Sequence, residues 1–238
     1  FGSNPSISLC GDPRYAGRVG GLFLFGGYAD FVRVCRFATL GEIEHRGELL
    51  HFPYDQTNAP GVFLNIARFQ GFAASDEAVL VAAWREMCMR TWNRPGLQRL
   101  EELRPIAEQV ADDLPLALRE RFLQGCNLAP GTREILLESL ARCAPEVKFA
   151  DPTGPLGRIQ VPVALAHGRD DLVISFLEAE HLRSLLPRGH PHRFYMTGMF
   201  SHGRSEAPTP GRVRTELQTL LGMLESMATL PLGKLPRA

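Results

Sequence analysis

Short apolar runs near both ends of the chain alternate with stretches of helical periodicity. The run at 22–25 is apolar on both faces, 159–168 is predicted to be a buried strand, and 192–198 is predicted to be a further strand; each is followed by, or ends in, glycine. A strand buried in a parallel sheet shows this continuous apolar pattern. The segments at 175–187 and 212–230 are predicted to be helices, the first with an amphipathic pattern, and 3–10 is predicted to be a helix because it carries few breakers after Pro5. The alternation predicts an α/β fold.

The central part of the chain has a different pattern. Segments at 76–92, 97–114, 116–126 and 132–144 carry apolar residues at helical spacing, with Gly and Pro between them. No strand is predicted there. We therefore expect an α/β core over 1–30, a helical cap or insertion over 31–158, and a return to the core over 159–238. The end of the chain beyond 230 is expected to fray.

Composition and charge narrow the possible functions. Hydrophobic residues make up 45% of the 238 residues, and 26 basic residues balance 26 acidic ones. This balance gives no electrostatic reason to expect nucleic acid as a partner, and no apolar run reaches the length of a membrane span. The five cysteines are widely spaced and form no C-x-x-C pair. They predict neither a disulfide framework nor a zinc site, and they favour a reducing, cytoplasmic compartment.

Two polar segments follow the last two predicted strands. The first, "AHGRDDLVIS", contains Asp170 and Asp171, and the second, "TGMFSHGRSE", contains His202. The carboxyl ends of parallel strands meet at one edge of the sheet, where active sites form. An acid after one strand and a histidine after the next can meet there, so that the carboxylate fixes the tautomer of the imidazole.

These segments resemble the α/β-hydrolase family, in particular serine hydrolases of the dienelactone hydrolase and esterase type. His167-Gly168-x-x-Asp171 matches the family's His-Gly-x-x-Asp strand end, and Ser201-His202-Gly203 matches the context of its histidine. The resemblance implies a doubly wound sheet with a helical cap, in which Asp171 is the acid and His202 the base. It requires no cofactor and no metal. His202 follows Asp171 at a separation of 31 positions, and the segment between them holds one helix and one strand, as in that family.

The nucleophile of this resemblance is expected outside the printed sequence. No G-x-S-x-G elbow occurs in the chain. In many α/β-hydrolases the nucleophile is followed by x-Gly, an apolar helix, "DPR" and then "RV" before the next strand. Phe1-Gly2 and "GDPRYAGRV" fit that pattern. The chain is therefore interpreted as a C-terminal portion that starts just after its serine, and the backbone N–H of Phe1 as an oxyanion donor.

Several other residues compete for roles. Asp30, after the first predicted strand, is a rival acid or a turn residue that caps the next segment, and Tyr28 and Asp30 are placed on the rim of a substrate pocket. Ser3, Ser6 and Ser8 are interpreted as capping or packing residues rather than nucleophiles. Three histidines lack the spacing of metal ligands and are expected to be solvated. They are His181, His190 and His192.

The resulting functional hypothesis is hydrolysis of small ester-like substrates, with the printed chain inactive by itself. The alternative is a non-catalytic relative that keeps the fold as a binding or interaction module. A dehalogenase-like or peroxidase-like member of the fold is a third reading, and an aspartate before Phe1 would favour the dehalogenase.

Overall fold

A computed structural model describes residues 2–15, 17–94, 96–97, 99–199 and 210–236. Its contacts divide the chain into two compact units. Unit 1 comprises residues 1–34 and 149–238, and unit 2 comprises residues 35–148. None of the described helices is both long enough and apolar enough to cross a bilayer.

Unit 1 contains a small parallel sheet, which confirms the mixed α/β class. Its strands are β1 (Leu22–Phe25), β4 (Val163–Gly168) and β5 (His192–Thr197), in the order β1-β4-β5. Both neighbouring pairs are parallel, so the carboxyl ends of all three strands lie at one edge. The central strand β4 is buried along its whole length, as its continuous apolar pattern predicts.

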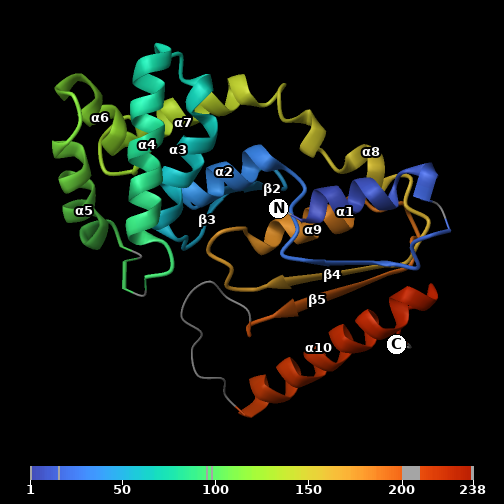
Figure 1. The fold of residues 1–238 in the computed structure, drawn as a ribbon. Coiled ribbons are helices and arrows are strands. Elements are labelled where there is room, and N and C mark those ends of the chain that lie inside the picture. Colours follow the sequence, from blue (N-terminus) through green and yellow to red (C-terminus); the bar gives the residue numbers. More distant parts are fainter. Residues whose placement is uncertain (1, 16, 95, 98, 200–209, 237–238) are drawn as a thin grey trace. The chain divides into compact units, whose positions relative to one another are not determined.

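Helices cover both faces of this sheet. The helices α1 (Ser3–Cys10) and α9 (Phe176–Leu185) contact β1 and β4, respectively, and α10 (Pro210–Thr229) contacts β5. Figure 1 shows α10 on the opposite side of the sheet from α1 and α9. The α1/α9 side holds an apolar core in which Ile7, Leu165 and Leu182 are almost completely buried. The short elements of unit 1 are η1 (Pro13–Tyr15), η4 (Lys148–Ala150), α8 (Thr153–Leu156) and η5 (Leu230–Leu232).

The described residues that follow α10, up to Pro236, contact unit 1, so the prediction that the tail frays was wrong for this part. Leu230 is buried, and Arg193 donates a hydrogen bond to the Pro236 carbonyl at 2.7 Å. A Cβ at Gly20 would lie 2.3 Å from the Pro231 carbonyl oxygen, so only glycine allows this close approach.

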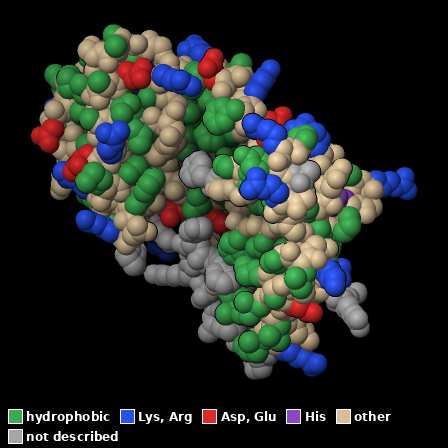
Figure 2. Space-filling model, turned by 45° about the vertical axis from the view of Figure 1, so that its right-hand side comes forward, with side chains coloured by type: hydrophobic (Ala, Val, Ile, Leu, Met, Phe, Trp, Pro, Cys, Tyr) green, Lys and Arg blue, Asp and Glu red, His purple; other side chains and the backbone are tan. Residues whose placement is uncertain are grey.

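Some apolar side chains of unit 1 remain exposed. Phe25, at the end of β1, is 46% exposed, although its strand was predicted to be buried on both faces. Hydrophobic side chains also gather on the surface in the lowest part of Figure 2, where α10 lies. Those on α10 are Val213, Leu217, Leu221, Leu224 and Met227.

Unit 2 is mainly helical but contains a hairpin, which corrects the prediction of no strand there. The strands β2 (Glu42–His45) and β3 (Glu48–His51) are antiparallel. They are joined by Arg46 and Gly47, both at positive φ, as in the tight turns that suit a hairpin. The strands are short and rich in charged residues, so they lack the continuous apolar run that predicts a buried strand.

The helices of unit 2 enclose a core of their own. Trp84 is fully buried and donates from Nε1 to the Phe122 carbonyl at 3.1 Å. A Cβ at Gly125 would overlap the indole of Trp84, so glycine is needed for this packing. The helical elements are α2 (Phe31–Leu40), η2 (Gln56–Asn58), α3 (Ala59–Ile66), η3 (Ala67–Phe69), α4 (Ala74–Thr91), α5 (Leu100–Asp112), α6 (Leu116–Gly125) and α7 (Thr132–Cys143); α2 begins in unit 1.

Candidate active site

The carboxyl edge of the sheet carries the polar residues predicted to form the site. The chain leaves β1 toward Tyr28 and Asp30, leaves β4 toward Asp171, and leaves β5 through Gly198 and Met199. A carboxylate binds backbone N–H groups at each of these three exits. Such turn amides have no partner in a helix or strand. The carboxylates supply their hydrogen-bond acceptors and thereby stabilise the conformation of each turn.

Asp171 is built into the turn after β4. Its side chain is buried, and its Oδ1 accepts hydrogen bonds from the N–H groups of Val173 at 2.8 Å and Ile174 at 3.0 Å. An aspartate that binds amides two and three residues ahead closes a compact Asx-type turn. The carboxylate predicted to be the acid is therefore held rigidly at the carboxyl edge.

His167, the first residue of the motif, ties the end of β4 to the far side of the same turn. It is fully buried, and its Nε2 lies 2.8 Å from the Ile174 carbonyl oxygen. A carbonyl oxygen only accepts, so this contact requires the proton on Nε2. The same nitrogen lies 3.7 Å from Asp171 Oδ2, beyond hydrogen-bond range. Asp171 and His167 thus both bind Ile174, Asp171 through its N–H and His167 through its carbonyl.

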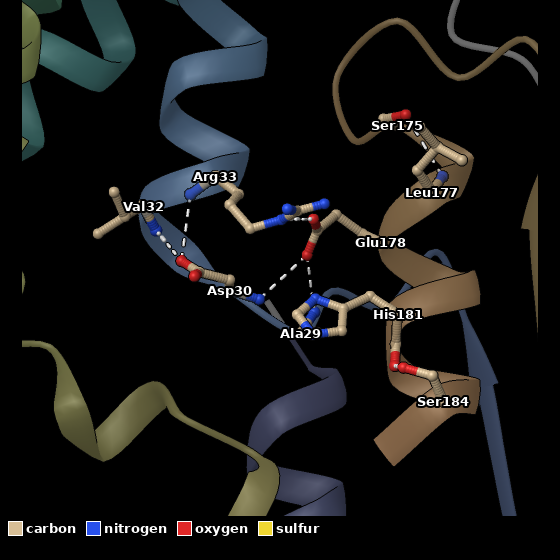
Figure 3. Close-up of polar contacts among 9 residues, drawn as sticks. All are labelled: Ala29, Asp30, Val32, Arg33, Ser175, Leu177, Glu178, His181 and Ser184. Carbon is tan, nitrogen blue, oxygen red and sulfur yellow. Dashed lines mark hydrogen bonds and ion pairs between the residues drawn. The ribbon is translucent and has the colours of Figure 1, made fainter. Parts of the chain in front are cut away.

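Asp30, the rival acid, caps a helix. Its Oδ1 accepts from the N–H groups of Val32 at 2.8 Å and Arg33 at 3.1 Å, in the first turn of α2 (Figure 3). Helix starts commonly use aspartate in this way, which is the capping role considered for Asp30 from the sequence. Tyr28, on the same segment, is buried with 4% of its surface exposed.

Glu178 of α9 holds the segment after β1, a role that the sequence analysis missed. Its Oε2 accepts from the N–H groups of Ala29 and Asp30, both at 3.0 Å, while its Oε1 pairs with Arg33 Nε at 2.7 Å (Figure 3). The Glu178 side chain is 0% exposed and that of Arg33 is 24% exposed. A buried carboxylate with three donors is well compensated for its desolvation.

Glu216 of α10 holds the segment after β5 in a similar way. Its Oε2 accepts from the Thr197 hydroxyl at 2.7 Å, and its Oε1 accepts from the Gly198 N–H at 2.8 Å. The Thr197 oxygen also accepts from the Met199 N–H at 3.1 Å. These bonds fix the chain up to Met199, three residues before His202.

Two predicted site residues, His202 and Phe1, lie outside the described residues. The serines at the start of α1 can be placed. Ser3 is buried and its Oγ has no hydrogen-bond partner among the described residues, while Ser6 Oγ donates to the Gly2 carbonyl at 2.8 Å. Neither hydroxyl is hydrogen-bonded to a base, as an activated nucleophile would be.

The cysteines are poor candidates for nucleophiles. Burial raises the pKa of the Cys88 thiol to about 11, and burial raises that of Cys126 well above the ordinary thiol value. Burial also raises the pKa of Cys10 and Cys143. An activated thiol needs the opposite shift, because the thiolate is the reactive form.

The three histidines predicted to be solvated are partly exposed, so the prediction holds only in part. His190 Nε2 is bonded to the Val161 carbonyl at 2.9 Å, and His192 Nδ1 to the His190 carbonyl at 2.9 Å. His181 Nδ1 is buried. Across the part of the chain that the structure describes, no group of His, Cys, Asp or Glu side chains is arranged to hold a metal ion.

Comparison with known proteins adds no evidence on identity, since no family model, curated protein or solved structure matches the chain. The case for a function therefore depends on the residues at the sheet edge.

The roles of Glu178 and Glu216 had only a faint signal in the sequence. Each is a charged residue on the buried face of an otherwise amphipathic helix. Leu177 and Ala179 beside Glu178 are buried, and Met223, two turns beyond Glu216, is buried as well. A carboxylate on such a face needs donors, but the sequence does not say which turn supplies them.

Proposed function

We propose that this chain supplies the acid and the base of a serine hydrolase acting on ester-like substrates. Asp171 is the acid, His202 the base, and the serine directly precedes Phe1. The observation that carries the proposal is the placement of Asp171. It is buried at the carboxyl edge, and its Oδ1 is held by two turn amides, in the motif that resembles the α/β-hydrolase acid.

The mechanism follows from the chemistry of these groups. His202 takes the proton of the attacking serine and later delivers it to the leaving alcohol, while Asp171 orients the imidazole and stabilises its charged form. The N–H of Phe1 donates to the oxyanion, and the N-terminus of α1 behind it favours the developing negative charge. The reaction needs neither a metal nor a cofactor.

The substrate is proposed to be a small ester with a hydrophobic acyl or alcohol part. Tyr28 and Asp30 are proposed to line its pocket, with Asp30 acting through its position rather than as the acid. Both Asp30 and Asp171 accept two backbone N–H groups through Oδ1, so these bonds do not separate them. Asp171 is preferred as the acid because it alone stands in the His-Gly-x-x-Asp context.

A non-catalytic binding or interaction module is the second candidate. It is favoured by one observation, the absence of a G-x-S-x-G elbow from the printed sequence. In that case Asp171 and His202 would be remnants of an ancestral site. The residue before Phe1 discriminates the two candidates, since only a nucleophile there supports the hydrolase.

Ester hydrolysis tests the proposal. Purified residues 1–238 are expected to leave p-nitrophenyl esters untouched. A chain extended upstream through the serine is expected to hydrolyse them, with Asp171→Asn and His202→Ala each lowering kcat by about 10³-fold or more. Asp170→Asn is the matched control, because Asp170 is exposed and adjacent, and it should leave kcat unchanged. Turnover by residues 1–238 that Ser3→Ala abolishes would overturn the proposal.

A further inference from the structure

We propose that the exposed face of α10 binds a second copy of this chain, with the two α10 helices packed antiparallel about a two-fold axis. This inference is independent of the proposed function, because it uses no residue of the proposed active site.

Large apolar side chains form a continuous stripe along the surface of α10. Leu217 is 53% exposed, Leu221 64% and Leu224 60%, and Val213 and Met227 extend the stripe toward the two ends of the helix. These five residues follow one another at spacings of four, four, three and three positions, so they share one face of the helix. We call them the α10 stripe.

The α10 stripe does not serve the packing of α10 within unit 1. Other residues form the side of the helix that contacts β5. Met223 and Ser226 are buried there, and the Ser226 hydroxyl lies 2.8 Å from that of Tyr195 on β5. Single exposed apolar side chains are ordinary, but a contiguous group of them marks an interaction surface. The α10 stripe therefore indicates a docking surface.

Two exposed charged residues border the stripe on one flank and identify its partner. Arg214 and Glu225 are eleven positions apart, about three helical turns, so they lie on the same side of α10. Leu221 follows Arg214 by seven positions and precedes Glu225 by four, which places both charges beside this leucine. Neither charged side chain forms an ion pair with another residue that the structure describes. The flank is thus positive near one end and negative near the other.

This arrangement is self-complementary under a two-fold axis. When two copies of one helix pack antiparallel, the same flank of each faces the other and the order of residues is reversed. Arg214 of one copy then lies opposite Glu225 of the partner subunit, and symmetry repeats the pair. The midpoints of the stripe and of the two charges both fall at residues 219–220, so the apolar and charged contacts come into register together. A parallel pairing would set opposite flanks together and would not join these charges.

The oligomeric state of residues 1–238 tests the proposal. Sedimentation velocity at about 1 to 100 μM protein is expected to show a species of twice the chain mass of 26.4 kDa. Leu221→Glu is expected to give the monomer, because it would bury a charge in the middle of the interface. Leu116→Glu is the matched control, since Leu116 is 81% exposed on α6 of unit 2. Circular dichroism of each variant checks that the fold is retained.

Charge reversal tests the antiparallel arrangement. Arg214→Glu and Glu225→Arg each set like charges opposite one another, so each is expected to raise the dissociation constant of the dimer by about tenfold. The double variant restores opposite charges and is expected to bring the constant back to within about threefold of the wild type. Both reversals agree with the direction that the helix dipole favours, so neither should weaken α10 itself.

Three results would overturn the proposal. The first is a monomer at every concentration, which would leave the stripe to a different partner. The second is a dimer that is insensitive to Leu221→Glu or to both charge reversals. The third is a mass that rises without a plateau and that Leu116→Glu lowers as much as Leu221→Glu, which indicates unspecific aggregation. None of these results bears on ester hydrolysis, so the proposed function stands or fails separately.

Discussion

Buried or partly buried carboxylates bind turn amides at the carboxyl edge of the sheet. Asp171, Glu178 and Glu216 each accept backbone N–H groups that follow a strand, and Glu178 is the most deeply buried of the three. Turn amides inside a protein need an acceptor, and an ionised one binds them strongly. At the residue scale, these acids build the turns from which the proposed site is assembled.

Replacing Glu178 tests this view. Glu178→Ala removes the acceptor of the Ala29 and Asp30 amides and the ion partner of Arg33, so we expect it to lower the free energy of unfolding by about 3–5 kcal/mol. Urea titration followed by circular dichroism measures the change. Glu180→Ala, at a partly exposed position of the same helix, should change it by less than about 0.5 kcal/mol. Equal effects of the two variants would contradict a special role for Glu178.

At the scale of elements, ion pairs between Glu42 and two arginines stabilise the hairpin of unit 2. Glu42 of β2 accepts from Arg36 Nη2 at 2.8 Å and is also hydrogen-bonded by Arg133. Burial raises the pKa of Glu42, but the hydrogen bonds from Arg133 and Arg36 and their positive charges outweigh it, so the pKa is lowered. A lowered pKa in the folded protein means stabilisation above the ordinary carboxyl value of about 4.3, which is lost as the pH falls toward the folded value.

A pH series on Glu42→Gln tests this interaction. The variant is expected to be less stable than the wild type at pH 7, and the difference should shrink as the pH falls below about 4.3, where the wild type loses its ion pairs. Urea midpoints across the series measure it. Glu48→Gln, at an exposed position of the same hairpin, is the control. A difference that stays constant with pH would show that the arginines do not stabilise the carboxylate.

Elements with a strong periodic pattern were predictable from the sequence. The helix α9 begins after Ser175, whose Oγ accepts the Leu177 N–H as predicted for a cap, and the continuous apolar run of β4 is a buried strand. The hairpin β2–β3 was missed because its four-residue strands carry little apolar pattern. The hydrogen bonds of Glu178 and Glu216 to the segments after β1 and β5 were missed, because they join residues distant in sequence that only the fold brings together.

At the scale of the whole molecule, the alternation of strand and helix at both ends predicted that separated segments share one sheet. The structure confirms this, since β1 pairs with β4 across the inserted unit 2. The same topology places Asp30, Asp171 and Gly198 after strands that end at one edge. The triad itself stays a prediction, because its histidine and oxyanion donor lie outside the described residues and its serine outside the printed sequence.

The most direct test of the central claim is to read the coding sequence immediately upstream of the Phe1 codon. The account predicts an open frame that ends in Gly-x-Ser directly before Phe1, which would complete the nucleophile elbow and join it to Asp171 and His202. A stop codon, or a codon for a residue that cannot act as a nucleophile, would contradict the hydrolase and favour the binding module.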